Sequence, residues 1–412
     1  MKHITLLYIS IFIISIFDVK AEEIKNINLH NKAGNIKMTA INYGARIPVL
    51  EVNGTDIVLG FDTLQHYIDY RQNFGAVVGR YIGRILGGKL TIDGKEYNLQ
   101  TGSNGDCSHG GTPSFSQRFF SIESNNDTSV VMRYVSPDGE NGFPGELNLS
   151  VTYTLTDEAL RIDYEANTTH ATVLNPSNHT FFNLSGNLSN DILEEVLWID
   201  SDSIALYNDK KRVTGELGDV TDTPFDFRQP KPIGRDINEE NIQLYVTKGY
   251  DHCYQLKNNG LLTKPVARLY DKSTDIIMEV YTTEPAMQIY TANGHNGTIK
   301  GKEGKPYRRR NAICFETMHF PDSPNKPHWP STLLRPGETF HSTTIFRFPN
   351  CSDLINAVSI NFLCIFFSFI SIIMSFFVLH YLLILSHYLY ANNTDAITHA
   401  KLYALIRNFP RK

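Results

Sequence analysis

The strongest constraint on the fold is a strict alternation of apolar and polar residues over two neighbouring stretches, residues 147–155 and 160–166. Apolar side chains occupy every second position of each stretch, and Asp157 and Glu158 mark a turn between them. Because successive side chains of a β-strand point to opposite faces of a sheet, a period of two indicates strands with one buried and one solvated face. The two stretches are therefore predicted to form an antiparallel pair.

Shorter runs of strand character recur at residues 36–41, 129–135, 275–281 and 340–348, separated by clusters of Gly, Asn, Asp and Pro. No amphipathic helix of comparable length, no fixed-period repeat and no Pro/Ser-rich linker is evident within residues 22–350. A chain of 412 residues, 42% of them hydrophobic, can bury a large core. These patterns predict an all-β fold in which residues 22–350 form one large antiparallel domain, a sandwich or a barrel.

The first residues of the chain have the pattern of a targeting signal. A long apolar run follows a basic start, and small or moderate side chains precede Ala21 at the positions that a signal peptidase reads. Residues 1–21 are therefore predicted to be a signal peptide. Asn-x-Ser/Thr sequons are plentiful, which is consistent with a secreted glycoprotein. They include Asn53, Asn126, Asn148, Asn167, Asn187, Asn296 and Asn350.

A second apolar stretch, residues 362–385, is long enough to cross the roughly 30 Å hydrocarbon core of a bilayer as one helix. Residues 351–361 would link this helix to the domain, and residues 386–412 form a short basic tail. By the positive-inside rule the tail is cytosolic and the large domain faces the lumen or the outside. The sequence thus predicts a membrane-anchored protein of the secretory pathway. A buried core helix or an erroneous exon is the alternative interpretation of this stretch.

The formal net charge of −5 gives no reason to expect a nucleic-acid partner, which would favour a concentrated basic face. The basic residues between Lys300 and Arg310 are most simply those of a solvated loop. A neutral or modestly charged small ligand suits this balance. Of the five cysteines, Cys364 lies in the predicted anchor. One disulfide among the other four is possible, but unpaired buried thiols are favoured.

A histidine, His179, lies between two strand-like segments within residues 175–184, among amides, a hydroxyl and two aromatic rings. A lone histidine beside phenylalanine is more often a structural residue than a catalytic one. His179 becomes a candidate because further polar clusters, far apart in sequence, suit the same site. These clusters are residues 73–85 with Arg84, 108–111 with His109, 249–254 with Asp251, 282–290 with Gln288, and 312–317 with Glu316.

Glu316 is the most informative of these residues because it sits inside an apolar run of strand character. A buried carboxylate is costly unless it is paired or used in chemistry. The alternative is a solvent-facing position on an edge strand, and the residue pattern alone leaves both interpretations open.

Two other kinds of site are not favoured. The glycine-rich residues 73–85 lack the G-x-x-x-x-G-K-[ST] pattern of a phosphate-binding loop. His109, His179, Asp251 and Glu316 are metal-ligating residue types, but no two histidines have the spacing of ligands on one helix. We therefore predict neither a metal nor a cofactor.

Five motifs, taken jointly and in this order, resemble the aldose 1-epimerase (galactose mutarotase) family. They are S-H-G-G at 108–111, N-H-T-F-F-N-L at 178–184, G-Y-D-H at 249–252, T-T-E-P-x-x-Q at 282–288 and C-F-E-T at 314–317. Residues 333–338, followed by Thr343 and Thr344, also resemble the closing signature of that family. The resemblance covers about residues 28–348 and implies a galactose-mutarotase-like β supersandwich with a sugar in an open cleft.

The resemblance also implies a role for each site residue. Glu316 would be the general base, His179 the general acid, and His109 a second imidazole near the ring oxygen of the sugar. The residues that would hold sugar hydroxyls are Arg84, Asp251 and Gln288. Many members carry Asn where this chain has Gly83, which leaves the sugar preference open.

The implied activity is interconversion of the α and β anomers of free glucose or galactose by a monomeric enzyme, through ring opening by general acid and base. We expect the nearby carboxylate of Glu316 to raise the pKa of His179. The sequons at Asn178 and Asn183 are expected to stay bare, because a glycan there would obstruct the cleft. A glycoside hydrolase with Asp251 as second carboxylate and a membrane-tethered lectin without turnover are the alternative functions.

Overall fold

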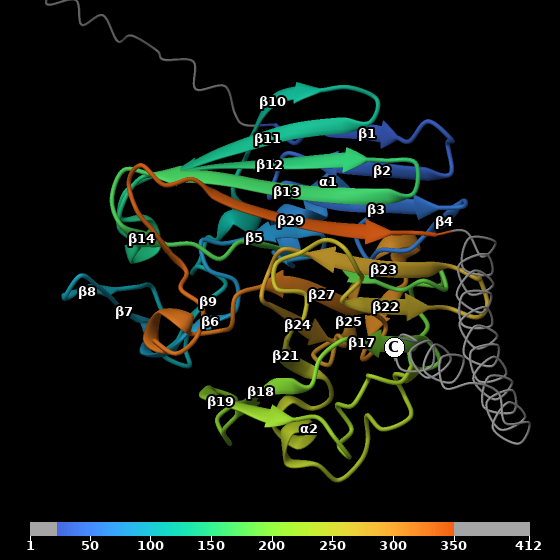
Figure 1. Cartoon of the computed structure of the whole chain (residues 1–412). Helices are drawn as coiled ribbons and strands as arrows, with labels where there is room; N and C mark the ends of the chain where they lie inside the picture. The colour runs from blue at the N-terminus through green and yellow to red at the C-terminus, as the bar shows by residue number, and fades with distance from the viewer. Residues whose placement is uncertain (1–22, 350–412) are drawn as a thin grey trace, which may run out of the picture. The chain divides into compact units, whose positions relative to one another are not determined.

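The computed structural model describes residues 23–349, and they form predominantly antiparallel β-sheets (Figure 1). The largest sheet has nine strands in the spatial order β10-β11-β12-β13-β29-β23-β22-β17-β20. In that order their bounds are Ser121–Asn125, Ser129–Ser136, Leu147–Leu155, Ala159–Thr168, Phe340–Arg347, Ile277–Thr282, Ala267–Tyr270, Val196–Ile199 and Lys231–Pro232. The prediction of a mainly antiparallel β domain is thereby confirmed.

Two further sheets carry most of the remaining strands. A four-stranded sheet runs β1 (Asn26–His30), β2 (Ile36–Ile41), β3 (Arg46–Val52) and β4 (Thr55–Asp56). A six-stranded sheet runs β16 (Phe181–Phe182), β27 (Ile313–Met318), β24 (Ala286–Tyr290), β21 (Asp251–Gln255), β18 (Ser203–Tyr207) and β19 (Val213–Asp219).

Five two-stranded ladders connect or flank these sheets. They are β5 (Ala76–Val78) with β15 (Ser177–His179), β6 (Arg84–Ile85) with β9 (Cys107–Ser108), β7 (Lys89–Ile92) with β8 (Lys95–Asn98), β14 (Thr172–Val173) with β28 (Leu333–Leu334), and β25 (Asn296–Lys300) with β26 (Pro306–Arg308). The α-helices of the described residues are short: α1 spans Leu64–Tyr70 and α2 spans Ile242–Thr247.

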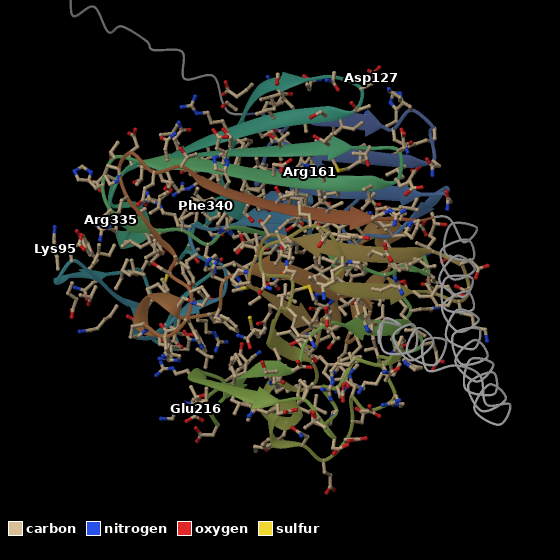
Figure 2. The ribbon with its side chains drawn as sticks, in the orientation of Figure 1. Lys95, Asp127, Arg161, Glu216, Arg335 and Phe340 are labelled. Atoms are coloured by element: carbon tan, nitrogen blue, oxygen red, sulfur yellow. The ribbon has the colours of Figure 1, made fainter. Side chains whose placement is uncertain are left out.

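The alternating stretches of the sequence become β12 and β13, which pair antiparallel with Val151 opposite Tyr164. Every apolar side chain of β12 is buried, and every polar one between them is only partly so. Arg161 lies on the wetter face of the same sheet (Figure 2). It forms an ion pair with Asp163 at 2.7 Å. The period of two in the sequence therefore separates core from solvent as predicted.

One continuous core joins the three large sheets. It contains Met38 of β2, Tyr153 of β12, Val280 of β23, Ile289 of β24 and Phe315 of β27. One face of the six-stranded sheet therefore packs in the core. Because side chains alternate along a strand, the other face is left to carry polar groups.

The predicted signal peptide, linker, transmembrane helix and tail all lie outside the described residues. Within residues 23–349, no helix has both the length and the apolarity needed to cross a membrane. Cys107, Cys253 and Cys314 are buried and free, as favoured by the sequence. The side chains of Asn178 and Asn183 are also buried and make internal hydrogen bonds.

Candidate active site

Three adjacent strands of the six-stranded sheet present polar side chains on the face turned away from the core. Phe315 of β27 packs in the core, so its neighbours Cys314 and Glu316 point to the opposite face. Antiparallel pairing places Glu316 opposite Gln288 of β24. The same pairing places Asp251 of β21 opposite Tyr290. Strand register therefore brings one carboxylate, one amide and a second carboxylate to a common surface.

His179 reaches this surface because the chain passes there from one sheet to the next. His179 ends β15, where it pairs with Ala76 of β5, and β16 then pairs with β27 so that Phe181 lies opposite Cys314. His179 Nε2 lies 3.3 Å from Glu316 Oε1. The imidazole also stacks on Phe181, with ring centroids 4.9 Å apart. The acid and base implied by the resemblance are thus in direct contact.

Arg84 and His109 enter the site from the β6–β9 ladder, in which Arg84 pairs with Ser108. His109 follows β9 directly, and its ring lies 5.7 Å from that of His179. Gly110 has a φ of +84°, and a Cβ there would lie 2.0 Å from the carbonyl oxygen of Gly79. Only glycine permits this backbone approach, which turns the chain immediately after His109.

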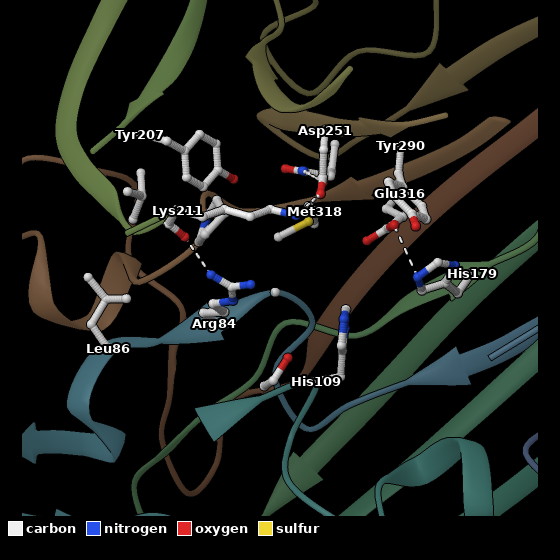
Figure 3. A pocket seen from close by; sticks show the side chains of 15 residues that line it. Arg84, Leu86, His109, His179, Tyr207, Lys211, Asp251, Tyr290, Glu316 and Met318 are labelled. Atoms are coloured by element: carbon white, nitrogen blue, oxygen red, sulfur yellow. Dashed lines mark hydrogen bonds and ion pairs between the residues drawn. The ribbon is translucent and has the colours of Figure 1, made fainter. Parts of the chain in front are cut away.

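These residues surround a cavity of about 270 Å³ (Figure 3). All six residues predicted from sequence line it: Arg84, His109, His179, Asp251, Gln288 and Glu316. One buried polar atom of these residues, Nδ1 of His109, has no hydrogen-bond partner among the described residues. Buried polar atoms are normally hydrogen-bonded, so this nitrogen is an exception at the site.

Sequence reasoning missed Lys211, whose side chain crosses the cavity to Asp251 (Figure 3). Its Nζ lies 2.5 Å from Asp251 Oδ2, and the other oxygen of Asp251 accepts from Gln288 Nε2 at 2.6 Å. The carbonyl of Lys211 in turn accepts a hydrogen bond from Arg84. Lys211 sits in a polar turn between β18 and β19, where the sequence gives no signal that one lysine faces a cleft. Tyr290, by contrast, is two positions from Gln288 on the same strand, so the alternation of side chains along a strand could have identified it as a site residue.

Burial dominates the protonation of the site. It raises the pKa of Glu316 to about 8, with the charge of Asp251 adding to the effect. It lowers the pKa of His179 to about 3, helped by His109, and that of His109 to about 4, helped by Arg84. The expectation that Glu316 raises the pKa of His179 is therefore wrong, because burial lowers this pKa and Glu316, whose own pKa is raised, carries little charge at neutral pH. At neutral pH these shifts leave Glu316 mostly protonated and His179 neutral.

One group of side chains at the site consists of metal-ligating residue types. Within the described residues, His179, Cys314 and Glu316 form a group whose potential ligand atoms lie within 4.8 Å of one another. However, Glu316 contacts Nε2 of the ring and Cys314 contacts Nδ1. A metal ion binds one nitrogen of an imidazole, and these two contacts are made to different nitrogens. This group also differs from the metal-ligating residues considered from sequence.

Residues 25–347 match the family model for aldose 1-epimerase. The chain belongs to the aldose 1-epimerase family. Membership confirms the predicted family and enzyme class, an isomerase. The chain is 37% identical over 324 residues to the galactose mutarotase of Bos taurus, covering 77% of this chain and 92% of that protein. It is 34% identical over 331 residues to the aldose 1-epimerase of Escherichia coli K12, covering 78% of this chain and 94% of that protein.

Solved structures agree with the fold of this family member. The GalM/aldose epimerase homologue from C. elegans matches with a TM-score of 0.73 and 26% identity, over 80% of this chain and 99% of that one. Galactose 1-epimerase from Lactobacillus acidophilus NCFM matches with a TM-score of 0.72 and 26% identity, over 80% and 96% of the two chains. The galactose-mutarotase-like architecture predicted for the domain is thereby confirmed.

Proposed function

We propose that the cavity binds a free hexose, glucose or galactose, and that Glu316 and His179 interconvert its anomers by general acid-base catalysis. The observation that carries this proposal is the 3.3 Å contact between Glu316 Oε1 and His179 Nε2 in the wall of the cavity. Exchange of anomers requires a proton to leave the C1 hydroxyl while another reaches the ring oxygen. These two oxygens are bonded to the same carbon, so the acid and the base must be close neighbours.

In this mechanism Glu316 accepts the proton of the C1 hydroxyl and His179 donates one to the ring oxygen. The ring opens to an aldehyde, rotation about the C1–C2 bond exposes its other face, and reverse transfers close the second anomer. No covalent intermediate is needed. Positioned acid-base groups contribute roughly 10²–10⁴-fold to such transfers. His109, Arg84, Asp251 and Gln288 would hold the sugar by its hydroxyl groups and ring oxygen.

The shifted pKa values make each group strong in its role. A carboxylate whose pKa is raised to about 8 is a stronger base than an ordinary glutamate. An imidazolium whose pKa is lowered is a stronger acid than an ordinary histidine. The working form, with Glu316 ionised and His179 protonated, has the same number of protons as the form with Glu316 protonated and His179 neutral. Hydrogen bonds from sugar hydroxyls to the carboxylate favour this form when substrate is bound.

Polarimetry on freshly dissolved α-glucose and α-galactose tests the function directly. We expect the full-length chain to accelerate the change in optical rotation, and His179→Ala to lose nearly all of this acceleration while its thermal melting stays cooperative. A wild-type chain that binds either sugar without changing the rate of rotation would identify a lectin. A His179→Ala protein with the wild-type rate would remove His179 from the mechanism.

We also propose that the enzyme is anchored in a membrane of the secretory pathway, with the catalytic domain lumenal or extracellular. The support comes from the apolar residues 1–21 and 362–385 and from six sequon asparagines that are exposed or half-buried: Asn53, Asn126, Asn148, Asn167, Asn187 and Asn296. Carbonate washing of membranes from expressing cells should leave the chain in the pellet. Complete extraction into the soluble fraction would remove the anchor.

A further inference from the structure

The wall of the cavity contains a cation that no carboxylate compensates. Arg84 is half-buried there, and one nitrogen of its guanidinium donates a hydrogen bond to the carbonyl oxygen of Lys211. Among the described residues, no carboxylate forms an ion pair with this guanidinium. Arginine presents five N–H donors in a planar fork, so most of its donors remain available to a ligand.

The carboxyl groups of the cavity are engaged elsewhere or uncharged. Oδ2 of Asp251 pairs with Lys211 Nζ at 2.5 Å, and its Oδ1 accepts from Gln288 Nε2 at 2.6 Å. Glu316 adds little negative charge at neutral pH, because burial raises its pKa to about 8. Arg84 and Lys211 are positive and Asp251 is negative, so the charged side chains that line the cavity leave one positive charge in excess.

The position of Arg84 relates this charge to one part of the sugar. In the proposed mechanism, Glu316 acts on the C1 hydroxyl and His179 on the ring oxygen. The other carbon bonded to the ring oxygen is C5, and its substituent C6 points away from C1. Arg84 enters from the β6–β9 ladder together with His109, whose ring lies 5.7 Å from that of His179 (Figure 3). We therefore place C6 of a bound aldopyranose toward Arg84.

We propose that the cavity prefers hexuronic acids, which carry a carboxylate at C6, to the neutral hexoses, and that Arg84 binds this carboxylate. The inference rests on the proposed function and names the preferred substrate class of the same site. A guanidinium can donate two parallel hydrogen bonds to a carboxylate, whereas glucose and galactose offer it one neutral hydroxyl at C6. The carboxylate takes no part in the proton transfers, so the same acid and base open the ring.

Lys211 is the residue that makes the cavity suitable for an anion. Its ammonium group occupies one oxygen of Asp251 and cancels the charge of that carboxylate. Without this lysine, an uncompensated carboxylate in the same cavity would repel an anionic substrate and attract the guanidinium of Arg84. A single excess positive charge matches a carboxylate better than a phosphate monoester, which carries nearly two negative charges at neutral pH.

The first test compares two substrates of the same shape with the wild-type, full-length chain. Glucuronate and its C6 amide, glucuronamide, differ in charge but hardly in size. Polarimetry at pH 7, with the spontaneous rate subtracted, should give a kcat/KM roughly ten- to a hundredfold higher for glucuronate, the worth of hydrogen bonds to a charged group. An equal or lower value would overturn the proposal. A higher value for glucose 6-phosphate than for glucuronate would overturn the choice of a carboxylate.

The second test measures the same ratio of kcat/KM values, glucuronate over glucuronamide, in variants. Arg84→Gln keeps a hydrogen-bond donor but removes the charge, and should bring the ratio close to one. Lys211→Met should lower the ratio by about fivefold or more, because Asp251 is then uncompensated. The control Lys210→Met removes the same charge from an exposed neighbour in the same turn, and should leave the ratio within about twofold of wild type. An unchanged ratio in Arg84→Gln would contradict the assignment of Arg84.

Calorimetry separates a failure of this inference from a failure of the proposed function. Wild type that converts glucose and glucuronamide as fast as glucuronate would retain the mutarotase function and lose the preference for an anion. Wild type that converts none of these sugars would lose the proposed function. Titration with glucuronate and glucuronamide would then still decide the inference, because tighter binding of glucuronate supports the anion site and equal binding removes it.

Discussion

Among the described residues, two histidine–glutamate pairs lie at strand β27, one with its glutamate in the strand and one with its histidine directly after it, and they differ in almost every other respect. His319 follows β27 and contacts Glu284, which precedes β24, at 2.7 Å between Nδ1 and Oε2. The second oxygen of Glu284 accepts a hydrogen bond from Ser342 at 2.5 Å. In the cleft, His179 and Glu316 are 3.3 Å apart.

The difference shows how one fold separates structural from chemical use of the same residues. Both oxygens of Glu284 have protein partners, His319 and Ser342, so its geometry is fixed. Glu316 is equally buried, at 4% exposure, but the described residues give it the imidazole of His179 as its polar contact. Both carboxyl groups border a cavity, but only Glu316 is incompletely satisfied by the described residues, so a substrate in the cleft can complete its hydrogen bonds.

Replacing each glutamate by glutamine gives the largest contrast. Glu316→Gln removes the base and should lower kcat by roughly 10³-fold. Glu284→Gln keeps the shape of the second pair and leaves the cleft intact, so kcat should stay within about twofold of wild type. Polarimetry on both variants checks this. A Glu284→Gln protein as inactive as Glu316→Gln would show that the two pairs are not functionally separate.

Stability should respond in the opposite order. Glu284→Gln disturbs two hydrogen bonds and should cost about 1–3 kcal/mol of unfolding free energy. Burial raises the pKa of Glu316 to about 8, so the folded state binds a proton more tightly than the unfolded state does. The stability that this proton contributes is complete below the unfolded pKa, near 4.5, and is lost as pH rises through 8.

Glu316→Gln, which cannot ionise, should therefore gain stability relative to wild type between pH 5 and pH 8, by an amount on the order of a few kcal/mol. Urea unfolding of both variants at several pH values measures the effect. A stability difference between Glu316→Gln and wild type that does not change with pH would show that Glu316 ionises normally in the folded protein.

The sequence predicted the fold and the residues of the cleft only in part. Strand period identified β12 and β13 and gave strand character to residues 312–317. The family resemblance named six of the residues that line the cleft. Neither route gave the direction of the His179 pKa shift, because the degree of burial depends on how separate sheets pack. Lys211 was missed for a related reason. It lies in a turn, where the direction of a side chain does not follow a regular alternation in the sequence.

Lys211→Met should have an intermediate effect confined to the cleft. Lys211 neutralises Asp251, and the charge of Asp251 helps to raise the pKa of Glu316. Without Lys211, that pKa should rise further and the lower limb of the pH–rate profile should move to higher pH by about 0.5 unit. Lys210→Met is the matched control, since Lys210 is exposed. Equal profiles for the two variants would remove Lys211 from the electrostatics of the site.

The smallest effect concerns the choice of sugar and is expected at Gly83, in the cavity wall. Its φ is +78°, which asparagine tolerates better than most residues, and a Cβ there would lie 3.2 Å from Met318 Cε, a flexible end that can move. An amide at this position would add one neutral hydrogen bond to bound sugar, present in ground and transition states alike.

Gly83→Asn should therefore leave kcat unchanged and alter the ratio of the KM values for galactose and glucose by roughly two- to tenfold. Gly83→Ala, which introduces the same backbone strain without the amide, serves as the control. Galactose and glucose differ only in the orientation of the C4 hydroxyl. Equal changes in both KM values would mean that the amide meets a hydroxyl that the two sugars share, and Gly83 would then have no part in choosing between them.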